Sequence, residues 1–443
     1  MRQSWILSIL LLFFIFSQLS SALDRQSNAD FHMRRQAIAT KANGGAILLF
    51  ASDEAEGPND LYGYRPDDSF FYLSGWSEPG AALLIMGATA DHPYTEILFL
   101  PNHNPSQEKW TGPKLGAESP EAGKITGFDR VEILDNLRSE LVRLLPTTRP
   151  TVYTDVPSGD ETSNSTAPLE WLNRANAFPV GISFQDVRPF LASLRTYKDA
   201  GEIERIRHAT DASIAAHLAA MRTVKPGVTE REISALMQYE WGKRGCERPA
   251  YAPIVGSGFY STVLHYSADS GTIQAGDVVV IDAAGEYSMY ASDITRTLPA
   301  SGKFTARQRE IYDIVLGAQQ AAAVAFVSGK SRLRRNQPDS LQDVAYNYIN
   351  THGKDLHGEP LGKYFIHGLG HYVGLNVHDP DDYDVTLGPG TVFTLEPGIY
   401  IPEEKLGVRI EDILYVDQSG KLINLTEKLP HTADDVERAM SGK

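Results

Sequence analysis

Five side chains that could bind a divalent metal ion lie in the second half of the chain, several beside strongly apolar stretches. They are Asp282, Asp293, His371, Glu396 and Glu411. An Asp at a strand end is usually a turn former, and a Glu before Pro-Gly is usually a surface carboxylate. A buried carboxylate is costly unless it is paired or metal-bound. Four of them together would repel one another unless a divalent cation compensated their charge. The residues alone therefore leave two interpretations open, scattered solvated acids or a metal centre.

The apolar pattern predicts the elements that would position these side chains. Residues 278–281 are a run of β-branched residues typical of a buried strand, and residues 391–395 and 407–416 also predict strands. Residues 199–222 and 306–326 have helical spacing. Helices interspersed with short strands of antiparallel type predict an α+β second half.

The first half has a different pattern. Apolar runs at residues 46–51, 81–86 and 96–100 predict buried strands separated by Gly, Pro and Asp clusters. Residues 131–145 have helical spacing, and residues 157–168 are rich in Ser, Thr, Asp and Pro, which predicts a surface loop. The change of pattern near residues 190–200 indicates a domain boundary.

Composition excludes several classes of protein. A chain of 443 residues suits two domains of ordinary size. A formal charge of -15 is a poor match for nucleic-acid binding, so no nucleic-acid partner is expected. The single cysteine, Cys246, excludes an intramolecular disulfide and a multi-cysteine zinc site. The chain also lacks the G-x-S-x-G elbow of serine hydrolases.

The N-terminus is typical of a secretory signal. Arg2 precedes an apolar run at residues 5–16, and small residues at 20–22 suit cleavage after Ala22. The run is shorter than the about 20 residues that span a bilayer. We expect residues 1–22 to be removed and the chain to be exported to the periplasm or secreted. A retained N-terminal membrane anchor is the alternative, and no other segment is apolar enough to span a membrane.

The order Asp, Asp, His, Glu, Glu resembles the dinuclear centre of the methionine aminopeptidase and prolidase superfamily. The surrounding sequences match as well: Ile281-Asp282-Ala283, Asp293-Ile294-Thr295-Arg296, Leu395-Glu396-Pro397-Gly398 and Arg409-Ile410-Glu411-Asp412. The resemblance implies a pita-bread catalytic domain over residues 193–443. It also implies that all five side chains bind metal.

Further segments resemble the proline-specific aminopeptidase P branch of this superfamily. His265, His367 and His378 are arranged as in that branch, where such histidines bind substrate and stabilise the transition state. Residues 65–81 and 108–116 resemble its N-terminal domain, which implies a smaller α/β domain over residues 23–192. By the same similarity Tyr251 lies near the metals. Asp60 and Arg409 would form a charged pair near the site entrance.

The resemblance also includes Trp110. By similarity it contributes to a substrate pocket, in this chain or in a neighbouring subunit, and the alternative is a packed aromatic side chain. The resemblance also implies a homodimer or homotetramer.

The resemblance implies hydrolysis of the bond before proline by a hydroxide that bridges two divalent ions. Hard oxygen ligands favour manganese, and the resemblance implies it too. Asp282, Asp293 and Glu411 would hold one ion, with Asp293 and Glu411 bridging to the ion that His371 and Glu396 complete.

Each remaining side chain of the site has an implied role in this hydrolysis. Glu396 would assist proton transfer to the leaving nitrogen and His378 would stabilise the oxyanion. His265 and His367 would shape the proline pocket. Two alternatives stay open, an Xaa-Pro dipeptidase with the same ligands and a non-catalytic peptide-binding module.

Overall fold

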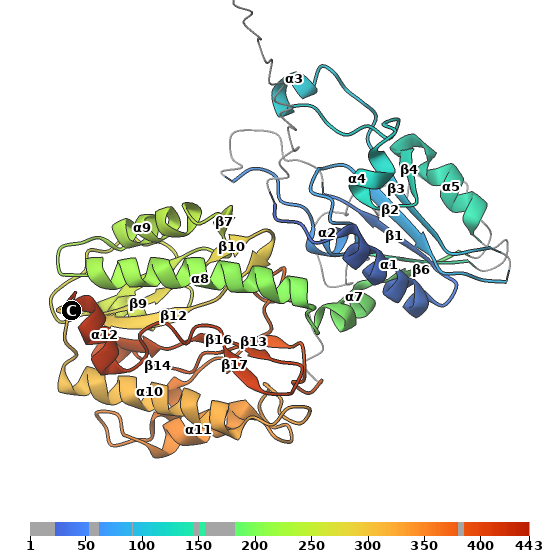
Figure 1. The fold of residues 1–443 in the computed structure, drawn as a ribbon. Helices are drawn as coiled ribbons and strands as arrows, with labels where there is room; N and C mark the ends of the chain where they lie inside the picture. Colours follow the sequence, from blue (N-terminus) through green and yellow to red (C-terminus); the bar gives the residue numbers. More distant parts are fainter. Residues whose placement is uncertain are drawn as a thin grey trace, which may run out of the picture.

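The computed structural model describes residues 23–52, 62–90, 92–145, 150–155, 182–379 and 385–442. Figure 1 shows a smaller N-terminal domain and a larger C-terminal domain on either side of helix α7 (Arg188–Arg195). The expected boundary at residues 192/193 falls inside this helix. The expected signal segment and the loop predicted at 157–168 lie outside the described residues. None of the described helices has the length and apolar character needed to cross a bilayer.

The N-terminal domain is built on a six-stranded mixed sheet. Its strands, in the order in which they pair, are β4 (Arg130–Ile133), β3 (Thr95–Leu100), β2 (Ala82–Met86), β1 (Ala46–Phe50), β5 (Thr151–Thr154) and β6 (Ser183–Asp186). β2 runs antiparallel to both of its neighbours, β1 and β3, and the outer pairings β3–β4, β1–β5 and β5–β6 are parallel. The strands predicted at 46–51, 81–86 and 96–100 are confirmed.

Both faces of this sheet are buried because helices cover each of them. The covering helices are α1 (Asn28–Ala42), α2 (Asp68–Ser74), α4 (Ala122–Thr126) and α5 (Leu137–Leu144). The short helix α3 (Glu108–Thr111) has no buried residue and extends away from the sheet (Figure 1). Ile47 packs with Ile38 of α1 on one face, and Leu48 packs with Leu141 of α5 on the other. The helix predicted at 131–145 is wrong at its start, because Arg130–Ile133 pairs with β3 as a strand.

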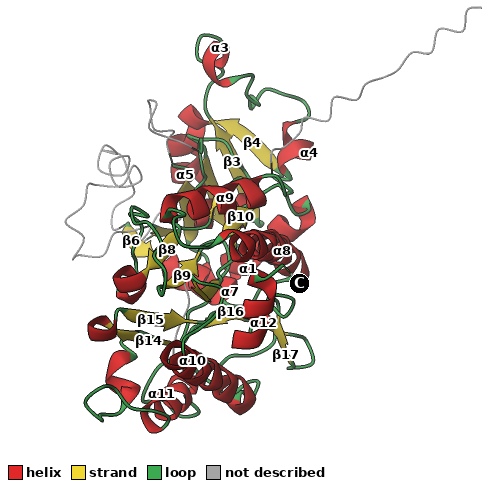
Figure 2. Ribbon diagram, turned by 90° about the vertical axis from the view of Figure 1, so that its left-hand side faces the viewer, coloured by secondary structure: helices red, strands yellow, loops and turns green. Residues whose placement is uncertain are grey.

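The C-terminal domain places two helix pairs around short antiparallel strands, as Figures 1 and 2 show. The helices are α8 (Ala200–Thr223), α9 (Glu230–Gly242), α10 (Ala306–Ala325), α11 (Leu341–Thr351) and α12 (Ala433–Met440). α8 packs on α9, and α10 packs on α11. Asp199 and Thr305 begin α8 and α10 with capping boxes, so both predicted helices are confirmed.

The strands of this domain form four small sheets. They are β7 (Arg248–Pro249), β10 (Gly285–Tyr287) and β11 (Tyr290–Ala291); β8 (Ile254–Ser257), β9 (Val278–Asp282) and β12 (Thr295–Pro299); β13 (Val392–Leu395), β16 (Asp412–Val416) and β17 (Leu422–Asn424); and β14 (Gly398–Ile401) with β15 (Leu406–Arg409). The single strand predicted at 407–416 is wrong, since it is divided at residues 410–411. The α+β architecture is confirmed.

Candidate metal centre

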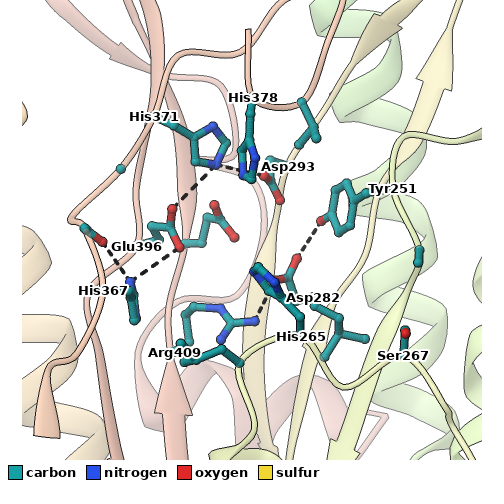
Figure 3. Close-up of a pocket in the computed structure, with 17 residues that line it drawn as sticks. Tyr251, His265, Ser267, Asp282, Asp293, His367, His371, His378, Glu396 and Arg409 are labelled. Atoms are coloured by element: carbon teal, nitrogen blue, oxygen red, sulfur yellow. Dashed lines mark hydrogen bonds and ion pairs between the residues drawn. The ribbon is translucent and has the colours of Figure 1, made fainter. Parts of the chain in front are cut away.

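A cavity of about 460 Å³ lies in the C-terminal domain, and all five expected metal ligands line it. Three histidines share the lining, His265, His367 and His378, together with Tyr251 and Arg409. Figure 3 shows these side chains converging from several segments of the chain. Between them lie apolar side chains, Ile254, Leu264 and Val377. The scattered, solvated interpretation of the acids is therefore wrong.

The four carboxylates stand at the ends of strands from both halves of the domain. Asp282 is the last residue of β9, and Asp293 lies two residues before β12. Glu396 follows β13, and Glu411 occupies the break between β15 and β16. Thr295 ties the halves together: its carbonyl accepts from the Glu411 amide at 3.0 Å, and its hydroxyl donates to Glu411 Oε2 at 2.7 Å.

His371 directs one ring nitrogen to the backbone and the other to the acids. Its Nδ1 lies 3.0 Å from the carbonyl oxygen of Tyr372, which only accepts, so Nδ1 carries the proton. Nε2, the nitrogen that the neutral ring leaves free to bind a metal ion, lies 3.3 Å from Asp293 Oδ2 and 3.5 Å from Glu396 Oε1. A backbone partner on one ring nitrogen is the usual arrangement of a metal-binding histidine.

The acids also have the electrostatics of a cation site. Burial raises the pKa values of Asp293, Glu396 and Glu411 well above the ordinary range, and repulsion between neighbouring carboxylates adds to the effect. Ligand atoms of Asp293, His371 and Glu411 all lie within 4.8 Å of one another. Asp293 Oδ1 is buried and has no hydrogen-bond partner among the described residues. A buried acceptor without a donor, beside other carboxylates, fits a divalent cation.

Asp282 is held on both oxygens by its neighbours. Tyr251 donates to Oδ1 at 2.6 Å, and Arg409 contacts Oδ2 at 2.6 Å. Burial alone would lower the pKa of Arg409, but Tyr400 and Asp282 raise it above its ordinary value. Arg409 was expected in a charged pair near the entrance. It is buried at 4% exposure, with Asp282 as its carboxylate partner among the described residues. The expected pair with Asp60 is not tested, because Asp60 lies outside those residues.

The three histidines occupy separate positions around the ligands. His367 Nε2 lies 2.8 Å from the Tyr400 hydroxyl, and its Nδ1 is 4.0 Å from Glu396 Oε2. The ring of His378 packs edge-on against His371, with centroids 4.2 Å apart. Burial lowers the pKa values of His367 and His378 to about 4, which keeps both neutral near pH 7. His265 is exposed at the cavity lining.

One expected site residue is not brought to this cavity. Trp110 on α3 is 89% exposed, and the cavity lining given by the described residues does not include it. The alternative of a packed aromatic is therefore wrong within this chain. Asp60 lies outside the described residues.

Sequence reasoning missed two buried side chains behind the ligands. His217 of α8 lies with Nε2 3.0 Å from the carbonyl oxygen of Ala283, directly after Asp282. Gln319 of α10 donates to the carbonyls of Leu395 and Ile410, directly before Glu396 and Glu411. Neither has a sequence signal, because a polar residue within a helix reads as solvent-facing.

Two family models match the chain. Residues 204–418 match metallopeptidase family M24, and residues 31–153 match the aminopeptidase P N-terminal domain. The chain is 32% identical over 439 residues to an Xaa-Pro aminopeptidase of Haemophilus influenzae, covering 93% of this chain and 97% of that protein. It is 30% identical over 475 residues to the human Xaa-Pro dipeptidase, covering 95% of this chain and 93% of that protein.

Solved structures give the same result. Aminopeptidase P from Escherichia coli with the inhibitor Pro-Leu superposes with a TM-score of 0.82 at 30% identity, covering 94% of this chain and 99% of that chain. A putative aminopeptidase P from Bacillus anthracis superposes with a TM-score of 0.84 at 27% identity, with the same coverage. The expected pita-bread catalytic domain behind an aminopeptidase P-type N-terminal domain is confirmed. The chain belongs to the Xaa-Pro aminopeptidases of metallopeptidase family M24.

Proposed function

We propose that this metalloaminopeptidase uses two divalent ions to release the N-terminal residue from peptides with proline in second position. The observation that carries the proposal is one cavity lined by four carboxylates and four imidazoles, including a buried Asp293 oxygen that has no hydrogen-bond partner among the described residues. A binding module would have no need to bury that much uncompensated charge, because burial of like charges destabilises the fold.

The ions would be held by the five expected ligands, with Asp293 and Glu411 shared between them. Divalent ions in such a site lower the pKa of bound water and so supply a hydroxide nucleophile near neutral pH. The predominance of hard oxygen ligands favours manganese. Manganese itself, and the sharing of the two carboxylates, are parts of the proposal.

The side chains of the cavity account for selectivity towards proline. An Xaa-Pro amide nitrogen carries no hydrogen and must gain a proton to leave. Glu396, at the cavity wall near His367, can carry that proton. His378 can donate to the oxyanion. His265 and His367, with the apolar side chains of the lining, would enclose the ring.

Peptide length separates this proposal from dipeptidase activity. We expect metal-dependent release of glycine from Gly-Pro-Ala, little from Gly-Ala-Ala, and none from N-acetyl-Gly-Pro-Ala, each measured with manganese and with a chelator. Cleavage of Gly-Pro alone would indicate an Xaa-Pro dipeptidase. If the chain binds metal but cleaves none of these peptides, the alternative of a non-catalytic peptide-binding module would be favoured.

Export and assembly are further parts of the proposal. The signal pattern at residues 1–22 supports cleavage after Ala22, and N-terminal sequencing of the exported chain would detect it. A chain that keeps Met1 and pellets with membranes would support the anchor. The exposed indole of Trp110 is free to enter the pocket of a neighbouring subunit, which a dimer or tetramer would require. Light scattering of the wild-type chain and of Trp110→Ala would test this.

A further inference from the structure

A buried charge cluster surrounds the residue that follows His378. Asp379 is 3% exposed, and its two oxygens contact Arg195 at 2.6 Å and Lys198 at 3.0 Å. Both cations are also 3% exposed and belong to the segment that connects the two domains. A carboxylate buried between two cations is held firmly, because removing any partner leaves an uncompensated charge.

The N-terminal domain connects this cluster to the loop that carries His378, residues 372–379. Asp68 on α2 lies 3.5 Å from Arg195 and accepts from the amide of Asn376 at 3.3 Å. The side-chain oxygen of Asn376 in turn accepts from the backbone N–H of His378 at 3.1 Å. Arg65, just before α2, donates to the carbonyl of Leu375 at 2.7 Å. Residues of the N-terminal domain therefore hold the backbone of the loop that carries His378 in the catalytic domain.

The loop is shaped around Asp379. The Asp379 amide donates to the carbonyl of Tyr372 at 3.0 Å, which closes the segment between His371 and His378. Gly374 lies so close that a Cβ added there would stand 2.6 Å from Asp379 Oδ2. Since the carboxylate fills the inside of the loop, its charge partners fix the position of the whole turn.

We propose that Asp379, held by Arg195 and Lys198, is a positioning residue for His378, and that Asp68 supports it through Arg195 and Asn376. The N-terminal domain thereby keeps the catalytic domain's oxyanion donor in place. This inference rests on the role given to His378 in the proposed function. It assigns the N-terminal domain a part in catalysis within its own chain.

A double-mutant cycle tests the inference. We expect Asp379→Asn to lower kcat for Gly-Pro-Ala about 10- to 100-fold, with KM and manganese binding unchanged. In a His378→Gln background the same substitution should have almost no further effect, since it acts through a side chain already removed. Asp68→Asn, a milder change at the edge of the cluster, should lower kcat less and follow the same pattern.

Glu96→Gln is the matched control, because Glu96 forms an equally buried pair with Arg35 inside the N-terminal domain, 2.7 Å apart. It should lower the melting temperature without the kcat effect. Hydrogen exchange provides a readout that needs no activity: Asp379→Asn and Asp68→Asn should speed exchange in residues 372–379, and Glu96→Gln should not.

Two results would separate the possible failures. Equal losses from Asp379→Asn in the wild-type and His378→Gln backgrounds, or unchanged exchange in residues 372–379, would overturn the inference. Full activity of His378→Gln would instead refute the role proposed for that histidine. If exchange in residues 372–379 rose equally in Glu96→Gln, the effect of Asp379→Asn would be a general loss of stability. That result would also overturn the inference.

Discussion

Gln319 joins the two strands that carry the glutamate ligands. It is 4% exposed, and its amide nitrogen donates to the carbonyl of Leu395 at 2.8 Å and to that of Ile410 at 3.2 Å. Its oxygen lies 2.9 Å from His431 Nε2, which donates to it. The Gln319 amide therefore fixes the distance between the peptide groups that precede Glu396 and Glu411. Gln319→Leu keeps most of the side-chain volume and removes all three hydrogen bonds.

The expected loss follows from these bonds. Each net hydrogen bond contributes about 1 kcal/mol, and a buried polar group left unpaired costs about 1–3 kcal/mol. Two carbonyls and one imidazole N–H lose a partner, so we expect the free energy of unfolding to fall by about 2–4 kcal/mol. Metal affinity should fall about 10- to 100-fold, as is typical when a residue that supports metal ligands is replaced.

Urea unfolding of the chelated chain measures the first quantity, and calorimetric titration with manganese measures the second. Gln320→Leu is the matched control, because it places the same substitution one residue along α10 at an exposed position. Unchanged manganese affinity in Gln319→Leu, despite a loss of stability, would refute the reasoning that this amide spaces the two glutamates. An equal loss in both variants would refute it as well.

Three further predictions test other parts of the site. His217→Leu should weaken manganese binding in the same way from the aspartate side, since it frees the carbonyl that follows Asp282; binding equal to wild type would contradict this. Glu230 is fully buried and accepts hydrogen bonds from the Tyr266 hydroxyl at 2.9 Å and the Gly271 amide at 2.6 Å. Glu230→Gln should therefore loosen the segment that carries His265. We expect it to raise KM and to leave metal binding intact. Burial raises the pKa values of three ligand carboxylates, Asp293, Glu396 and Glu411, so in the metal-free chain their ionisation costs stability. Their contribution to stability is complete below the unfolded pKa values of about 4, and it is lost as pH rises through the folded values. The melting temperature gained on adding manganese should therefore grow between about pH 5 and about pH 8, and a gain independent of pH would contradict the assignment.

The metal ligands could be predicted because their order and surrounding sequences resemble those of a known family, and local patterns predicted several strands that position them. The β-branched run before Asp282 predicted β9 and the position of its carboxylate. Glu411 was placed in the right region but inside one long strand. The break there could not be predicted, because Thr295, more than a hundred residues earlier, holds Glu411 across the interface of the two halves.

Other features depend on contacts that no local pattern records. Helix α1 was missed because Arg34 and Arg35 occupy buried positions on it, and Arg35 is neutralised by Glu96 on a distant strand. Its apolar face is therefore interrupted by charge. The contact between Arg195 and Asp379 spans 184 positions and exists only once the connecting segment packs against the loop that carries His378. Long-range ion pairs of this kind leave no periodicity in a single sequence.

The most direct test of the central claim is a metal titration followed by activity. The chelated chain would be titrated with manganese while bound metal and glycine release from Gly-Pro-Ala are measured together, alongside Asp293→Asn. We predict two equivalents bound per chain, activity that rises with occupancy, and loss of both in the variant. Full activity in the chelated chain, or wild-type metal binding by Asp293→Asn, would contradict the account.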